Sequence, residues 1–128
     1  MLEILAIAVG GALGAVARFS LGQAIGTWLG TEFPWGILLI NVSGSLAIGV
    51  IFVLLVEQGQ LSTVYRSAIM VGFLGAFTTF STFSLQTLAL IETGRFLEAL
   101  TYVLASVVIS LGAVALGVFI TRLLTGEA

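Results

Sequence analysis

Five hydroxyl side chains crowd into the seven residues from Thr78 to Ser84, inside a long stretch without charge. That stretch runs over residues 67–91, and its centre is Thr79. Hydroxyls there can bond the N–H and C=O groups that a broken helix sets free, and Gly75 tolerates unusual backbone angles. Helices broken at this depth mark ion sites. We therefore predict a break near Gly75, Thr78 and Thr79; the alternative is a continuous helix whose hydroxyls bond back to their own turn.

Two aromatic rings and two further polar rows accompany this cluster. Phe80 and Phe83 are three residues apart, hence on one helical face, and the positive edges of their rings can help to hold an anion. Asn41 offers two amide N–H donors, and Ser45 follows it at helical spacing. The other row has four-residue spacing and consists of Tyr102, Ser106 and Ser110. Packing or hydrogen bonds between helices explain any single row, but all of them together indicate a polar path.

Arg18 is the charge that lies farthest from the ends of the apolar stretches. It continues a four-residue repeat that includes Gly10 and Gly14, the spacing that lets helices approach closely, so we expect it to face protein. Its partners there would be carbonyls, water, another chain or an anion. The alternative is an arginine that extends to the membrane interface. Either interpretation fits a place in a wet vestibule.

The composition excludes several classes of protein. Charged residues make up 8% of 128 residues, against roughly 25% in a soluble domain. Without cysteine or histidine the chain has no thiolate or imidazole metal site. All six glutamates lie at the ends of apolar stretches or in loops, so neither a carboxylate active site nor a cation pump has its residues. We expect no enzyme and, at net charge −2 without a basic patch, no nucleic-acid partner. A passive pathway for an anion or a neutral solute is favoured.

Charged residues divide the chain into four stretches long enough to cross a membrane. About 20 helical residues span a hydrocarbon core, and helices satisfy their own backbone there. We predict one all-α membrane domain over residues 1–128, with helices at about 2–29, 34–56, 64–91 and 96–124. Two arginines lie toward each side, which leaves the orientation open. One alternative is a single orientation that something other than charge determines. For four short helices we expect instead that the chain inserts both ways and pairs with its inverted copy as an antiparallel homodimer in the lipid bilayer.

Three motifs resemble signatures of the Fluc (CrcB) fluoride channels, and together they extend over nearly the whole chain. The third is the most specific. The motifs are Gly10-Gly11-x-x-Gly14-Ala15-x-x-Arg18-Phe19, Pro34-Trp-Gly36-x-x-x-x-Asn41-Val-x-Gly44 and Gly72-Phe-x-Gly75-x-Phe77-Thr78-Thr79-Phe80-Ser81-Thr82-Phe83-Ser84.

The resemblance implies a dual-topology, antiparallel homodimer of the bacterial inner membrane with two pores, which passively exports cytoplasmic fluoride. It also implies a structural sodium ion at the dimer centre, held by backbone carbonyls of Gly75 and Thr78 from both subunits. Arg18 would lie near the vestibule. The side chains that the resemblance places along the fluoride pore are Asn41, Phe80, Phe83, Ser81, Thr82, Ser84, Tyr102, Ser106 and Ser110.

The chain departs from the family pattern at two positions. Ala76 stands where many members have a second glycine, which adds a methyl group beside the implied sodium site, and Ile37 stands where many have threonine. Two other functions compete with the channel. A small dual-topology multidrug exporter is disfavoured because no carboxylate lies inside a span, and a structural assembly subunit leaves the central polar cluster without a purpose.

Overall fold

The computed structural model describes residues 1–59 and 61–126, and within these residues it contains helices and short connections but no strand. The four predicted spans and the all-α fold are confirmed, and each span begins and ends within one residue of its predicted limits. The helices are α1 (Leu2–Leu29), α2 (Trp35–Phe52), η1 (Val53–Glu57), α3 (Thr63–Ser67), η2 (Ala68–Leu74), α4 (Gly75–Phe77), α5 (Phe80–Glu92) and α6 (Phe96–Thr125).

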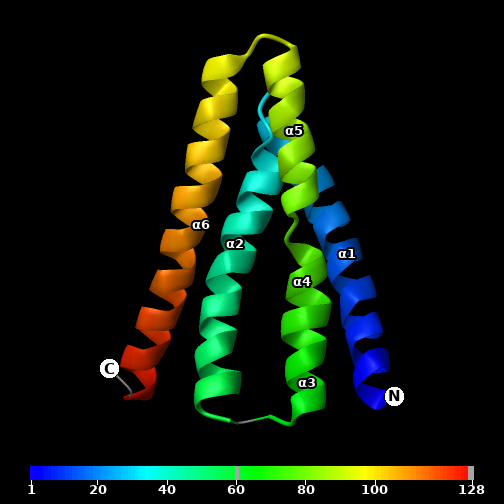
Figure 1. Ribbon diagram of the computed structural model, residues 1–128, viewed down its shortest axis with the longest axis vertical. Coiled ribbons are helices and arrows are strands. Elements are labelled where there is room, and N and C mark those ends of the chain that lie inside the picture. The colour runs from blue at the N-terminus through cyan, green and yellow to red at the C-terminus, as the bar shows by residue number, and fades with distance from the viewer. Residues whose placement is uncertain (60, 127–128) are drawn as a thin grey trace.

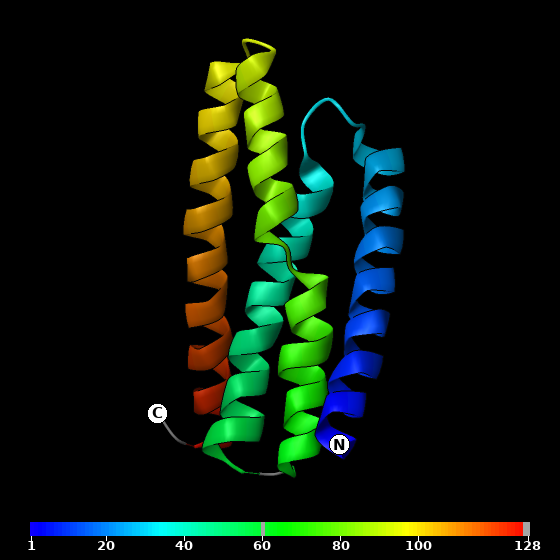
Figure 2. The same ribbon diagram turned by 45° about the vertical axis from the view of Figure 1, so that its right-hand side comes forward.

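The spans form an up-and-down bundle (Figure 1). The start of α1 and the end of α6 lie at the same end of the bundle as the end of η1 and the start of α3, and the connections from α1 to α2 and from α5 to α6 lie at the opposite end (Figures 1 and 2). α2 and α6 therefore run in the same direction, opposite to α1 and to the third span, which comprises α3, η2, α4 and α5. This arrangement brings the polar rows of α2, α5 and α6 to the middle of the bundle.

The surface of the bundle is apolar almost everywhere, as a helix bundle surrounded by lipid requires. Most large aliphatic side chains of α1 and α6 are exposed, and the buried core is small. It gathers near the end where α5 meets α6, where it consists of Leu38, Phe83, Leu90, Ala99 and Tyr102. The tight turn between these two helices needs Gly94, whose φ of 76° is one that residues with a side chain rarely adopt.

Glycines let the helix backbones touch at two crossings. A methyl group added to Gly49 on α2 would lie 2.5 Å from the carbonyl oxygen of Val114 on α6, and one added to Gly117 would lie 2.5 Å from that of Leu46. On the other side of the bundle, methyl groups at Gly10 and Gly14 would overlap the backbone of the third span. The glycine repeat of α1 therefore serves, at these two positions, packing within the chain.

The ion pairs among the described residues lie at the ends of the bundle, and one of them joins two spans. Arg122 near the end of α6 forms an ion pair with Glu57 at the end of η1, across 65 residues of sequence. Arg95 pairs with Glu98 at the opposite end of the bundle. This hydrogen bond raises the pKa of the Arg95 guanidinium above its ordinary value, so that side chain stays charged.

The crossing of α2 and α6 leads to a stability prediction. Gly117→Ala places a methyl group against the backbone of α2, and we expect it to lower the free energy of unfolding by about 2 kcal/mol. Gly112→Ala on the same helix meets no atom within 4 Å, so it should be neutral or slightly stabilising. Thermal unfolding of both variants in detergent, followed by tryptophan fluorescence, checks this; equal melting temperatures would contradict the close crossing.

Candidate functional site

The third span is interrupted near its middle. α4 ends at Phe77 and α5 begins at Phe80, while Thr78 (φ −80°, ψ 156°) and Thr79 (φ −152°, ψ 121°) are extended. The predicted break is confirmed, and the alternative of a continuous helix is wrong. The expected reason needs correction at Gly75, which has the helical angles φ −63° and ψ −35°. The break therefore makes no use of the conformational freedom of this glycine.

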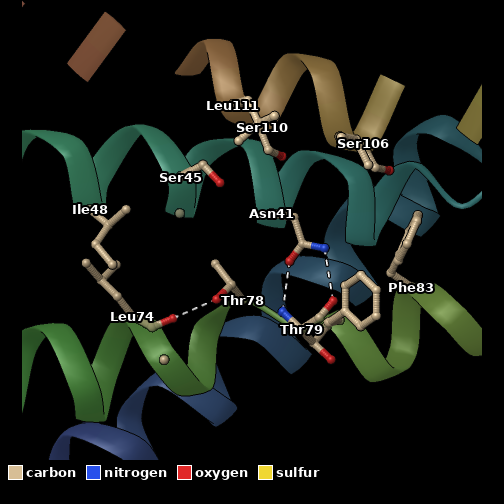
Figure 3. Close-up of a pocket in the computed structure, with 14 residues that line it drawn as sticks. Asn41, Ser45, Ile48, Leu74, Thr78, Thr79, Phe83, Ser106, Ser110 and Leu111 are labelled. Carbon is tan, nitrogen blue, oxygen red and sulfur yellow. Dashed lines mark hydrogen bonds between the residues drawn. The ribbon is translucent and has the colours of Figure 1, made fainter. Parts of the chain in front are cut away.

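Asn41 on α2 bridges the break. Its Oδ1 accepts a hydrogen bond from the backbone N–H of Thr79 (2.8 Å), and its Nδ2 donates to the carbonyl oxygen of the same residue (3.0 Å). One side chain thus satisfies both backbone groups of an extended residue in the middle of the span (Figure 3). The sequence predicted two amide donors for an ion, but one of the two N–H bonds of Nδ2 is taken by this contact. One remains for a ligand.

The hydroxyls of Thr78 and Thr79 also bond backbone groups next to the break. The Oγ1 of Thr79 accepts from the backbone N–H of Thr82 (3.2 Å) and so caps α5. The hydroxyl of Thr78 donates back to the carbonyl of Leu74 (3.0 Å). This is the role that the dense run of hydroxyls predicted for a helix broken inside a membrane.

A cavity of about 380 Å³ lies between α2, the broken span and α6. Figure 3 shows it from the side. Five residues of the predicted pore line it, together with both residues of the predicted sodium site. Its polar and aromatic lining consists of Asn41, Ser45, Thr78, Thr79, Phe80, Phe83, Ser106 and Ser110. None of the residues that line it is titratable, so its polarity comes from dipoles rather than from charge.

Ser106 and Ser110 of α6 are both among the residues that line this cavity. Both Oγ atoms are buried and have no hydrogen bond among the described residues. Hydroxyls elsewhere on α6 behave differently, because Thr101, Thr121 and Thr125 donate back to carbonyls of their own helix. A buried hydroxyl without a partner is costly, so these two are the strongest indication that the cavity receives a polar ligand.

Phe80 and Phe83 both line the cavity, although Phe80 is 77% exposed in the single chain. Phe83 is 8% exposed, and its ring centroid lies 5.4 Å from that of Phe80 and 5.1 Å from that of Tyr102. Tyr102 itself is fully buried and does not line the cavity. Its hydroxyl donates to the Oε1 of Gln86 on α5 (2.8 Å). The sequence gives no signal for Gln86, because a lone glutamine in a helix does not indicate which side chain it will bond.

The remaining predicted pore residues lie outside this cavity in the single chain. Ser81 and Ser84 are exposed, and Ser84 donates back to the carbonyl of Phe80 (2.8 Å). Thr82 lines a second groove of about 420 Å³, between α1 and α5, together with Arg18. No ion pair joins Arg18 to another described residue. The part that these residues play in a pore stays a prediction.

Backbone carbonyls are the groups at this site that fit a metal ion. No cluster of three acidic, histidine or cysteine side chains occurs among the described residues. At the break, however, no main-chain N–H beyond Thr78 bonds to the carbonyls of residues 75–78 within the described parts of the chain. Such carbonyls at a helix C-terminus carry partial negative charge. Oxygen ligands of this kind suit a hard cation such as sodium.

Comparison with known proteins places the chain in a family. Residues 5–118 match the family described as "CrcB-like protein, Camphor Resistance (CrcB)". The chain belongs to this family. It is therefore a multi-pass protein of the bacterial inner membrane, from a family that includes ion channels.

Three relatives of this CrcB-like protein carry the name "Fluoride-specific ion channel FluC". The one from Nitrobacter winogradskyi is 50% identical over 94% of this chain and 96% of its own length. The one from Magnetococcus marinus is 44% identical over 96% of this chain and all of its own length. The one from Methylococcus capsulatus is 53% identical over 98% of this chain, but the chain spans only 56% of that relative.

The bridge across the break leads to a prediction about Asn41. Asn41→Ala leaves the backbone N–H and C=O of Thr79 without partners, so we expect the free energy of unfolding to fall by about 2–4 kcal/mol. Ser43→Ala on the same helix removes a hydroxyl that bonds only its own turn, and it should cost under about 0.5 kcal/mol. Thermal unfolding in detergent separates the two. Equal stability of both variants would show that Asn41 does not hold the break.

Proposed function

We propose that the protein is a passive, selective channel that exports fluoride from the bacterial cytoplasm. The observation that carries this proposal is the pair of buried, unpartnered hydroxyls of Ser106 and Ser110, two residues that line a cavity together with Asn41, Phe80 and Phe83. The names of the relatives, which are fluoride-specific ion channels, support fluoride as the ion.

The donor set of the cavity suits a small anion. Fluoride is strongly hydrated, so a narrow path must replace its water with hydrogen-bond donors that converge on the ion. Serine hydroxyls and the remaining amide N–H of Asn41 are donors of this kind. The edges of the phenylalanine rings add weak positive potential. Because no full positive charge lines the cavity, the ion is held weakly enough to leave again.

The absence of titratable groups from the lining favours passive flow over proton-coupled transport. A coupled exporter needs a carboxylate or an imidazole that gains and loses a proton in the membrane. No such group lines the cavity. Hydrogen fluoride that enters from acidic surroundings dissociates in the neutral cytoplasm, and the anion then leaves down the membrane potential. The multidrug exporter is therefore disfavoured.

The working unit is, in this proposal, an antiparallel homodimer with two pores. A single chain leaves large apolar side chains of all four spans exposed, and its cavity is bordered by one copy of each polar row. The two-against-two distribution of arginines gives neither orientation an advantage, so inverted copies meet in the same membrane. An inverted partner would complete each pathway and present a second set of donors.

A structural sodium ion at the dimer centre is the second part of the proposal. The carbonyls of Gly75 and Thr78 would hold it, because Gly75 begins the three-residue α4, Thr78 follows its end at the break, and both line the same cavity. Two inverted copies would bring two such ends together. A monovalent cation between them would offset the repulsion of the helix C-termini and fix the distance between the breaks. The methyl group of Ala76 is the change that this site must accommodate.

Fluoride flux is the experiment that tests the channel. Purified protein in liposomes, with the potential clamped by potassium and valinomycin, should release fluoride rapidly to an electrode and should release no chloride. Ser106→Ala and Ser110→Ala each remove a hydroxyl from the cavity, so we expect about tenfold slower fluoride efflux, the size of one hydrogen bond to an ion. The dimer should persist in both variants.

Thr101→Ala is the matched control for these variants. Thr101 is an exposed hydroxyl of the same helix, and it bonds only the carbonyl of Leu97. Its removal should leave fluoride efflux unchanged. Folded wild-type protein that passes neither fluoride nor chloride would reject the channel and return attention to an exporter or an assembly subunit.

Insertion in both directions is tested separately from flux. Reporters fused to the C-terminus, one active in the cytoplasm and one active in the periplasm, should both give signal, because the arginines are balanced between the two sides. Addition of three lysines at the C-terminus should retain that end in the cytoplasm and abolish the periplasmic signal. A wild-type C-terminus found only in the cytoplasm would contradict the antiparallel dimer.

A further inference from the structure

Ser45 is a cavity residue that lies one helical turn beyond Asn41. It belongs to α2, and it lines the same cavity as Ser106 and Ser110. Figure 3 shows it between Asn41 and Ile48, on the side of α2 that borders the cavity. Four residues of helix correspond to about 6 Å along the axis. Ser45 therefore extends the polar lining by one step past the residue that bridges the break.

The hydroxyl of Ser45 has no hydrogen bond to any described residue. Serines and threonines inside membrane helices usually donate to a carbonyl of their own preceding turn. Ser43, two positions earlier on α2, does so by donating to Ile40 (3.1 Å), and Thr78 across the cavity donates to Leu74 (3.0 Å). Ser106 and Ser110 of α6 also lack a hydrogen-bond partner among the described residues, but their oxygen atoms are buried, whereas Ser45 is half-buried.

The lining changes character beyond Ser45. Figure 3 shows the order along the cavity, with Phe83 and Ser106 at one end, Asn41 and Ser110 in the middle, and Ser45 and then Ile48 at the other end. Ile48 and Leu74 make this last part of the lining apolar. An ion that moves in this direction meets no polar side chain of α2 on the cavity after Ser45. Ser45 is thus the last polar residue of α2 along this cavity before its apolar end.

We propose that Ser45 is a further ion-binding residue of the permeation pathway. Its hydroxyl donates to the anion as the ion passes from the level of Asn41 and Ser110 toward Ile48, and it replaces one water of the hydration shell at that step. This inference rests on the proposed anion channel. It assigns to that channel a residue that belongs to none of the three sequence motifs. It also separates two neighbouring serines of α2 by function, because Ser43 points to a different, apolar groove.

Alanine substitutions at these two serines test the proposal. We expect Ser45→Ala to slow fluoride efflux from liposomes by about tenfold, because one hydrogen bond to the ion is lost. Ser43→Ala should leave the rate as in wild type. Both variants must first be shown to form the same oligomer by size-exclusion chromatography. Chloride efflux is measured in parallel, so that a general leak is recognised.

Each outcome of this comparison is decisive. A Ser45→Ala rate within a factor of two of wild type would overturn the assignment, and so would an equal loss in Ser43→Ala, because the effect would then be one of helix packing. Wild-type protein without fluoride flux would instead refute the proposed function on which the inference rests. The two failures are therefore distinguishable in the same assay.

Cysteine substitution gives a second measurement that does not depend on the rate of the variant itself. The natural chain has no cysteine, so Ser45→Cys introduces a single thiol. Mercuric chloride, a small thiol reagent, should block most of the remaining fluoride efflux of Ser45→Cys and little of that of Ser43→Cys. Reducing agent should restore the flow. Equal sensitivity of the two variants would place Ser45 outside the ion path.

Discussion

The structure depends on one constraint, which is that a backbone inside a bilayer must find all its hydrogen bonds within the protein. At Thr78 and Thr79, in the middle of the third span, the helix is broken and its backbone loses the hydrogen bonds that a continuous helix would make. Asn41 compensates for part of this loss from a neighbouring helix, by accepting from the N–H and donating to the C=O of Thr79. An unpaired backbone group in such a place costs several kcal/mol, so the two hydrogen bonds of Asn41 stabilise the break.

The position of the site follows from that bridge. It ties α2 to the broken span, while the close contact at Gly49 and Gly117 ties α2 to α6. The cavity lies among these three helices. The two contacts fix which face of each helix borders the cavity, and so they determine which donors line it. The same break frees the carbonyls of residues 75–78 and starts α5 so that Phe80 and Phe83 border the cavity. The same interruption thus leaves carbonyl acceptors for the proposed cation and positions the aromatic rings along the proposed anion path.

Sequence alone predicts the parts of this structure that are local. Charge-free stretches set the spans, and the hydroxyls from Thr78 to Ser84 locate the break, because both features act within one segment. The pairing of Asn41 with Thr79 spans 38 residues, and nothing in the residues between them records it. For the same reason the sequence places Tyr102 in a polar row but does not reveal that its hydroxyl is directed at Gln86 rather than into the cavity.

The location of Arg18 bears on how a channel of this kind can be both selective and fast. A guanidinium in contact with a dehydrated anion would hold it in a deep well, because charges interact strongly where water is excluded. The chain instead places Arg18 in the groove beside Thr82, while neutral dipoles alone line the cavity that contains Ser106 and Ser110. In the proposed channel the arginine attracts the ion toward the protein, and several weak donors then share it. Weak, successive contacts let a strongly hydrated ion enter and also leave.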